Sequence, residues 1–223
     1  MHRNIPTTQM NIVIPLKDTP SRYPELTYCL RSIEKYYPTD VYIVSKQKIK
    51  GTNHIYYEDK TLNRYENVRQ KVLKACDVLK EPFIFMNDDM YLLEPFKEVD
   101  YYCGKLKERT RTGSVQRAIV NGAIKESKDG LNYSIHQPMV IDPEIMRDIK
   151  SLSFKDIHGS MSSRKKVKLR DVKMRSKKDH AHPEKFIKGL PFFSTSDFSL
   201  KIIGDFMEEL FPYVLNAPES ECI

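Results

Sequence analysis

The sequence predicts an α/β protein with a mostly parallel, Rossmann-type sheet flanked by helices. In the first hundred residues, short apolar runs alternate with longer segments of helical periodicity. Polar and charged residues follow the end of each apolar run. Because alternating strands and helices need crossover connections, successive strands are expected to lie parallel in one sheet.

In the first half, four apolar runs are expected to be strands, at residues 11–16, 40–45, 54–57 and 83–86. A first helix begins at Pro24, where proline is tolerated as the first helical residue. Its expected buried face holds Leu26, Cys29, Leu30, Ile33 and Tyr37. A second helix over residues 63–80 buries Val68, Val72, Ala75, Cys76 and Leu79.

The second half is less regular. Residues 131–135 and 139–142 read as extended, and Pro143 begins a short helix. Residues 194–197 (STSD) are typical of a helix start, because Ser, Thr and Asp cap the first turn. The helix that follows is expected to bury Leu200, Ile203, Phe206, Met207 and Leu210.

Composition indicates an ordinary globular protein. The 223 residues are 40% hydrophobic and 30% charged, and we expect a single domain over residues 1–223. No apolar run approaches the roughly 18 to 20 residues of a membrane span, and the N-terminus lacks a signal-peptide pattern. Four cysteines lie far apart without a CxxC pair, which favours reduced thiols in the cytoplasm over a zinc or disulfide framework.

One segment concentrates the positive charge. Residues 164–178 (RKKVKLRDVKMRSKK) hold nine Lys or Arg and one Asp, a net of +8 against +7 for the whole chain. The segment has no aromatic residue, so we expect an exposed loop or irregular helix. One interpretation is a solvated surface loop. The other is a contact for a polyanion, such as nucleic acid or donor phosphates, through Lys165, Lys166, Lys168 and Arg170.

The most informative stretch is residues 83–96 (FIFMNDDMYLLEPF), in which Asn87, Asp88 and Asp89 follow an apolar run. In open α/β sheets, ligands bind beyond the carboxyl ends of the strands. Charged residues also follow the other three expected strands, so these groups are predicted to gather at one edge. A divalent cation, completed by substrate phosphates, would compensate the two carboxylates. The alternative is that the aspartates only cap the next turn.

The order of these motifs resembles nucleotide-sugar glycosyltransferases of the glycosyltransferase-A fold, in particular phage-type enzymes. The resemblance rests on IVIPLKDTPSRYPELTYCLRSIEKYYPTDVYIVS, NVRQKVLKAC, FIFMNDDMYLLEPF, HQPMVIDPEIM and FFSTSDFSLKIIGDFMEELFP. It covers most of the chain except about 158–185, and a looser similarity extends to Stealth-type sugar-phosphate transferases. The acidic motif here reads Asn-Asp-Asp rather than Asp-x-Asp.

The resemblance implies a donor half at about 10–100 and an acceptor half at about 101–223. It implies a nucleotide-diphosphate sugar as donor and Mn²⁺ or Mg²⁺ as metal, with Asp89 and His158 as candidate ligands. Asp88 would hold the donor ribose or sugar. Further donor contacts are expected from Pro15, Arg22, Asp59, Asn67 and Lys71. Asn67 and Lys71 lie one helical turn apart, so both can face the site. The alternatives are an exposed helix face for these two residues and a surface ion pair for Arg22.

Two residues are candidates for proton transfer. His136 follows an expected strand end and has a suitable pKa, although a structural histidine is the alternative. Asp197 would serve as base or distal metal ligand by the resemblance, whereas capping is the simpler interpretation.

Phage-type enzymes of this kind modify hydroxymethylated pyrimidines in DNA, which suits a basic segment beside the site. Other acceptors that we consider are glycans and proteins. Sugar-phosphate transfer is another possible reaction, and a non-enzymatic nucleic-acid-binding module is the third class of function.

Overall fold

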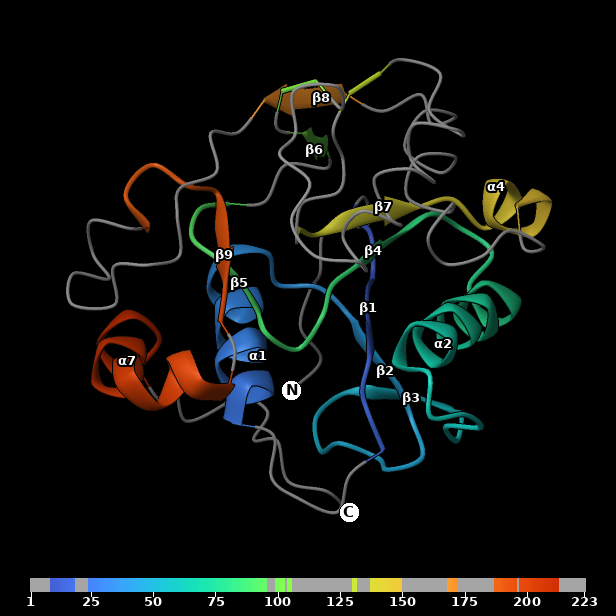
Figure 1. Cartoon of the computed structure of the whole chain (residues 1–223), viewed down its shortest axis with the longest axis horizontal. Coiled ribbons are helices and arrows are strands. Elements are labelled where there is room, and N and C mark those ends of the chain that lie inside the picture. The colour runs from blue at the N-terminus through green and yellow to red at the C-terminus, as the bar shows by residue number, and fades with distance from the viewer. Residues whose placement is uncertain are drawn as a thin grey trace.

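The computed structural model describes the chain in several ranges, shown as coloured ribbon in Figure 1: residues 9–18, 24–95, 99–102, 104–105, 130–131, 137–149, 168–171, 187–195 and 197–212. Its centre is a five-stranded sheet in the order β3-β2-β1-β4-β7. The strands are β1 (Ile12–Pro15), β2 (Val41–Ser45), β3 (Asn53–Tyr56), β4 (Phe83–Phe85) and β7 (Met139–Ile141).

The first four strands of this sheet run parallel, and β7 pairs antiparallel with β4. All four strands predicted in the first half are present. The α/β class with a mostly parallel sheet is therefore confirmed. Each parallel connection returns to the same end of the sheet, so the carboxyl ends of β1 to β4 share one edge.

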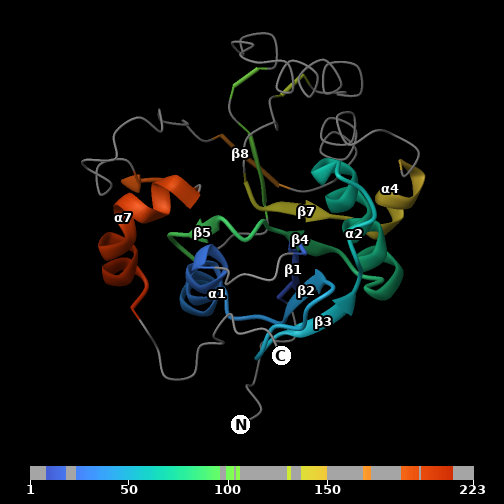
Figure 2. The same cartoon turned by 60° about the horizontal axis from the view of Figure 1, so that its bottom comes forward.

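Helices cover both faces of the sheet (Figures 1 and 2). Helix α1 (Pro24–Tyr36) lies on one face, whereas α2 (Arg64–Val78) and α4 (Pro143–Asp148) lie on the other. Alternate residues of β1 serve the two faces, because strand side chains alternate in direction. Ile12 and Ile14 pack in the core cluster with α1, and Val13 packs in the cluster with α2.

The local signals for these helices agree with the structure. The expected buried face of α1 is buried throughout. Asn63 caps α2 by accepting hydrogen bonds from the amides of Tyr65 and Glu66. Asp142 caps α4 in the same manner, directly before Pro143.

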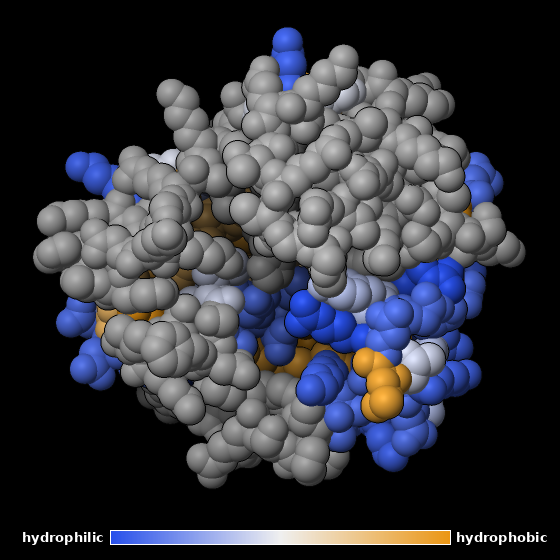
Figure 3. All heavy atoms as spheres, in the orientation of Figure 1, coloured by the Kyte–Doolittle hydropathy of each residue, from blue (hydrophilic) through white to orange (hydrophobic). Residues whose placement is uncertain are grey.

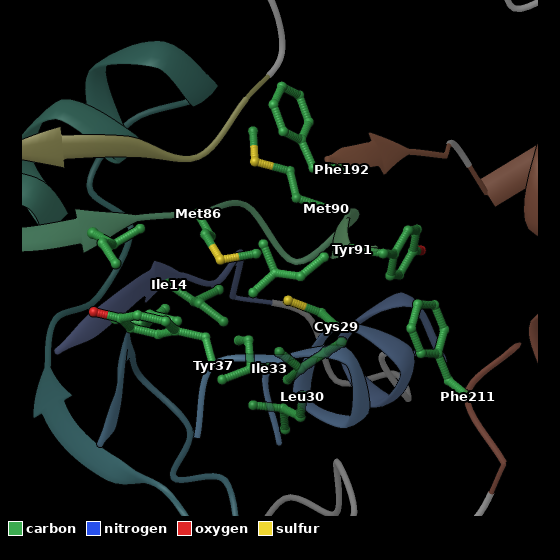
Figure 4. Packing of buried hydrophobic residues seen from close by; sticks show 14 of the residues in the cluster. Ile14, Cys29, Leu30, Ile33, Tyr37, Met86, Met90, Tyr91, Phe192 and Phe211 are labelled. Atoms are coloured by element: carbon green, nitrogen blue, oxygen red, sulfur yellow. The ribbon is translucent and has the colours of Figure 1, made fainter. Parts of the chain in front are cut away.

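A second small sheet lies beside α1. Strand β5 (Met90–Leu92) pairs antiparallel with β9 (Phe192–Ser194), and helix α7 (Asp197–Leu210) follows β9 and contacts α1. Tyr91 of β5 packs its ring against Phe193 and Phe211, with ring centroids 4.8 Å and 6.1 Å apart. Figure 4 shows this cluster joined to the face of α1 that carries Cys29.

A third pair of strands corrects one expectation. Residues 168–171 form β8 (Lys168–Asp171), which pairs parallel with β6 (Val99–Tyr102). The sequence alone predicts a loop or irregular helix throughout 164–178. Backbone pairing with a partner about seventy residues away leaves no periodic signal within a charged segment, so the strand could not be foreseen.

Three further observations concern residues 131–135, membrane-spanning helices and the surface of the molecule. Of residues 131–135, only Leu131 falls in the described ranges, where it forms an isolated bridge with Lys105. Among the helices of the described ranges, none is long and apolar enough to cross a membrane. On the face shown in Figure 3, the coloured surface is mainly hydrophilic.

Candidate functional site

The loops after β1 and β3 are joined by a reciprocal pair of hydrogen bonds. The amide of Asp18 donates to Asp59 Oδ2 at 3.1 Å, and the amide of Asp59 donates to Asp18 Oδ2 at 2.5 Å. The loop after β2 joins them, since the amide of Lys46 donates to Asp18 Oδ1 at 3.0 Å. Polar residues from four strand ends were predicted to gather at one edge, and these hydrogen bonds join three of the four.

Lys71 of α2 lies beneath this pair of aspartates. Its side chain is only 2% exposed, and its Nζ lies 2.7 Å from Asp59 Oδ1 and 3.5 Å from Asp18 Oδ1. The ammonium group also donates to the carbonyl oxygen of Leu16, the residue after β1. A buried charge is tolerated only when it is paired and hydrogen-bonded. Lys71 meets both conditions, because it pairs with two carboxylates and donates a hydrogen bond to one carbonyl oxygen.

The cluster of Asp18, Asp59 and Lys71 carries a net charge of −1 when all three groups are ionised. Both carboxylates remain partly exposed, at 12% and 19% of the side chain. A second ion pair, Lys46 with Glu58 at 2.5 Å, lies on the exposed surface at the ends of β2 and β3. Because the aspartates already accept backbone amides, their positions are fixed before any ligand binds.

Asn67 of α2 fixes the loop that follows β3. Its Nδ2 donates to the carbonyl of Thr61 at 2.7 Å, and its Oδ1 accepts from the amide and the hydroxyl of Thr61 at 3.2 and 3.3 Å. The side-chain amide of Asn67 thus holds the loop after β3 through hydrogen bonds to Thr61. Contact between Asn67 and a donor stays a prediction.

The acidic turn, Asn87 to Asp89, connects β4 to β5. It leaves the same edge of the sheet as the loop after β1, because β4 pairs parallel with β1. The carbonyl of Asn87 accepts from the amide of Met90 at 3.2 Å and from Cys29 Sγ at 3.7 Å. The carbonyl of Asp89 accepts from the amide of Thr195 at 3.1 Å. The turn is thus held from α1 and from the end of β9.

The charges of the acidic turn reach the thiol of Cys29. Burial raises the pKa of this thiol well above its ordinary value, and the negative charges of Asp88 and Asp89 raise the pKa further. Figure 4 shows Cys29 on the helix face toward Met86 and Met90, which flank the turn. A protonated thiol is neither a metal ligand nor a nucleophile, so Cys29 has a packing role at neutral pH.

Asp88 and Asp89 are the two carboxylates of the acidic turn that could bind a metal ion. Within the described ranges, no three His, Cys, Asp or Glu side chains gather as a set that could hold a metal ion by itself. A pair of carboxylates is nevertheless the donor set that Mg²⁺ uses when substrate phosphates and water complete its shell. The two aspartates fit an ion that is shared with a phosphorylated substrate.

The structure describes the other predicted site residues to different extents. Pro15 is the buried last residue of β1, and Asp197 is the first residue of α7. Lys168 and Arg170 belong to β8, and the side chains of these two residues and of Asp197 are outside the description. Outside the described residues altogether are Arg22, His136, His158, Lys165 and Lys166.

One polar contact of the site was not predicted. Tyr91 Oη lies 2.7 Å from Thr195 Oγ1, which in turn donates to Glu25 Oε1 at 2.8 Å. Glu25 lies in the first turn of α1, where an acidic side chain commonly stabilises the positive end of the helix dipole. A contact across 170 residues leaves no local pattern that could have indicated it.

Comparisons with known proteins inform the fold alone. No protein-family model matches the chain, and no curated protein matches it. Among solved structures, the chain is similar to a Bacillus anthracis protein described as a "putative glucose-1-phosphate thymidylyltransferase", solved in complex with a sucrose. The TM-score is 0.52 at 9% identity, over 94% of this chain and 98% of that chain. The comparison therefore supports the α/β fold, and it gives no support to a phage DNA glycosyltransferase in particular.

Proposed function

We propose that the protein is a transferase that uses a nucleotide-diphosphate sugar, bound at the shared carboxyl edge of β1 to β4. The observation that carries the proposal is the acidic turn. Asp88 and Asp89 leave β4 at the edge where the loops after β1, β2 and β3 are already tied together. Such an edge is where open α/β sheets place their ligands.

Residues of this chain have distinct roles in the proposed reaction. Asp89 would hold a divalent ion, Mn²⁺ or Mg²⁺, and Asp88 the ribose or sugar of the donor. When bound, the ion supplies positive charge to the leaving diphosphate. Asp59, held in place by Lys71, faces the donor from the end of β3. Asp197 or His136 would take the proton of the acceptor.

The proposed transfer is of the sugar, to an acceptor hydroxyl. We propose a hydroxymethylated pyrimidine in DNA as the first acceptor to test. Support comes from the sequence, because residues 164–178 carry a net +8 and duplex DNA binds through its phosphates. Glycans and proteins are the other acceptors to include.

A second candidate function follows from the structural comparison. The similar Bacillus anthracis protein is named for transfer of a thymidylyl group to glucose 1-phosphate. In that chemistry, the nucleotide is transferred from a nucleoside triphosphate and pyrophosphate leaves. The carboxyl edge described above suits either reaction, since both bind a nucleotide and a sugar through phosphate.

The released product distinguishes the reactions. The purified chain is incubated with a panel of nucleotide sugars and, in turn, hydroxymethylated DNA, glycans and protein acceptors. It is incubated separately with nucleoside triphosphates and sugar 1-phosphates. Nucleoside diphosphate indicates sugar transfer, nucleoside monophosphate indicates sugar-phosphate transfer, and pyrophosphate indicates nucleotidyl transfer. We expect nucleoside diphosphate. The absence of any product in all incubations would contradict a transferase and leave a binding module.

A further inference from the structure

Thr195 forms hydrogen bonds with three segments of the chain: the acidic turn, β5 and α1. Its amide donates to the carbonyl of Asp89 in the acidic turn, and its hydroxyl contacts Tyr91 of β5 and Glu25 of α1. The residue is only 6% exposed and directly follows β9, two positions before α7 begins.

The direction of the hydrogen bonds follows from proton counting. A threonine hydroxyl has one proton, and an ionised carboxylate only accepts. Thr195 therefore donates to Glu25, so that Tyr91 must donate to Thr195. The result is a polar chain from Tyr91 through Thr195 to Glu25, in which each hydroxyl proton has one defined acceptor.

The Tyr91 end of this chain is enclosed. Tyr91 is fully buried, and its ring is fixed between Phe193 and Phe211. In Figure 4 its hydroxyl points away from Cys29 and Met86, toward the edge of the apolar cluster. A buried hydroxyl without a partner is costly, so Tyr91 holds the Thr195 hydroxyl in one place. That constraint passes to Asp89 through the backbone of Thr195.

We propose that Thr195 is a positioning residue for the acidic turn: its hydroxyl, fixed between Tyr91 and Glu25, sets where Asp89 meets the donor. The inference rests on the proposed function for its catalytic consequence. The structural part, that the hydroxyl orders the turn, stands on the contacts alone. A small displacement of a group that contacts the reacting phosphates lowers the rate much more than it lowers affinity.

The test compares three variants. Thr195→Val removes the hydroxyl and keeps the shape, and Thr195→Ser keeps the hydroxyl. Thr39→Val is a matched control, because Thr39 also donates a hydroxyl hydrogen bond, to the carbonyl of Met10 at 3.1 Å, on the opposite edge of the sheet. If Thr195→Val does not fold, Glu25→Met removes the acceptor of the Thr195 hydroxyl, and Glu25→Gln retains an acceptor there.

The first readout is hydrogen exchange of peptides that cover residues 86–93. We expect faster exchange there in Thr195→Val (or Glu25→Met), parent-like exchange in Thr195→Ser (or Glu25→Gln), and no change in peptides over residues 41–45. The inference is overturned if exchange over 86–93 is unaltered, or if it rises equally over both regions.

The second readout is turnover of the donor identified by product release. We expect kcat to fall about tenfold or more in Thr195→Val with the donor KM within about twofold, and Thr195→Ser and Thr39→Val to resemble the parent. Parent-like kcat in Thr195→Val would overturn the positioning role. If the parent itself turns over no donor, the proposed function fails, and the exchange experiment still decides whether the hydroxyl orders the turn.

Discussion

The ammonium group of Lys71 lies 2.7 Å from the carboxylate of Asp59, almost completely buried beneath the carboxyl edge of the sheet. Asp59 follows β3 and Lys71 comes from the middle of α2, so the ion pair fixes the helix to the strand end. Asp18 joins the pair from the end of β1. The cluster thus orders two loops of the proposed donor site without a ligand.

The stability of the fold depends on this cluster. Lys71→Met should lower the free energy of unfolding by about 3 kcal/mol, because it leaves Asp18 and Asp59 facing each other without the cation. Urea unfolding followed by circular dichroism measures the change. Lys46→Met is the matched control, since solvent screens its exposed pair with Glu58 and the loss of that pair should change the stability little. An effect of Lys71→Met as small as that of the control would refute the role of the cluster.

Alkaline pH should destabilise the protein through Cys76. Burial raises the pKa of this thiol from 9.0 to about 12 in the folded protein. Between these values the unfolded chain releases a proton that the folded chain keeps, so the free energy of unfolding falls as pH rises above 9. Tyr28 acts in the same direction, because burial and its hydrogen bond to Glu208 raise its pKa to about 12.

The thiol contribution is isolated with Cys76→Ala. Urea unfolding at pH 8 and pH 10.5 should show a smaller loss of stability in this variant than in the parent, by at most about 1.4 kcal/mol per pH unit. The cavity left by alanine is the same at both pH values and cancels in the comparison. Equal losses in parent and variant would mean that the thiol keeps an ordinary pKa.

Much of the sheet could be predicted from sequence, because its first four strands are short apolar runs separated by helices of clear periodicity. The acidic turn could also be recognised from sequence, because Asn87 to Asp89 interrupt an apolar stretch. The pairing of β5 with β9 was not foreseen. Each strand has three residues, and about a hundred residues separate them, so no local pattern specifies the pairing.

The internal order of the candidate site was not predicted. Lys71 and Asn67 were expected to face the donor because they lie one helical turn apart. The structure shows both side chains held by loop residues, Lys71 by Asp59 and Asn67 by Thr61. Burial of a lysine depends on acceptors brought by distant strand ends, which helical periodicity does not encode.

Metal dependence is tested at Asp89. Asp89→Asn should lower donor turnover by orders of magnitude while the circular dichroism spectrum stays that of the parent. EDTA should inhibit the parent, and added Mn²⁺ or Mg²⁺ should restore activity. Asp77→Asn, on the exposed last turn of α2, is a control that should leave turnover unchanged. Full activity of the parent in EDTA would refute the metal assignment.

The basic segment is tested by charge removal. Replacing Lys165, Lys166 and Lys168 by Gln should weaken binding to duplex DNA uniformly across sequences. Each lost phosphate contact should reduce the log–log salt slope by about 0.9. Hydrolysis of the donor without acceptor should not change. The measurement is fluorescence anisotropy over a salt series.

The control for that experiment replaces three exposed lysines elsewhere by Gln: Lys74, Lys80 and Lys188. If both triple variants bind DNA with the parent's affinity and salt slope, the segment is a solvated surface and DNA is not recognised through it. Equal weakening in the two variants would indicate a response to net charge alone.

The central claim is that the nucleotide binds at the carboxyl edge of the sheet, on Asp88 and Asp89. The most direct measurement is a crystal structure with Mn²⁺ and the nucleoside diphosphate released in the product assay, with Mn²⁺ located by its anomalous scattering. We predict an anomalous peak coordinated by Asp89, with the diphosphate on the metal and the nucleoside toward Asp59. A nucleotide bound away from this edge, with no metal at Asp89, would contradict the claim.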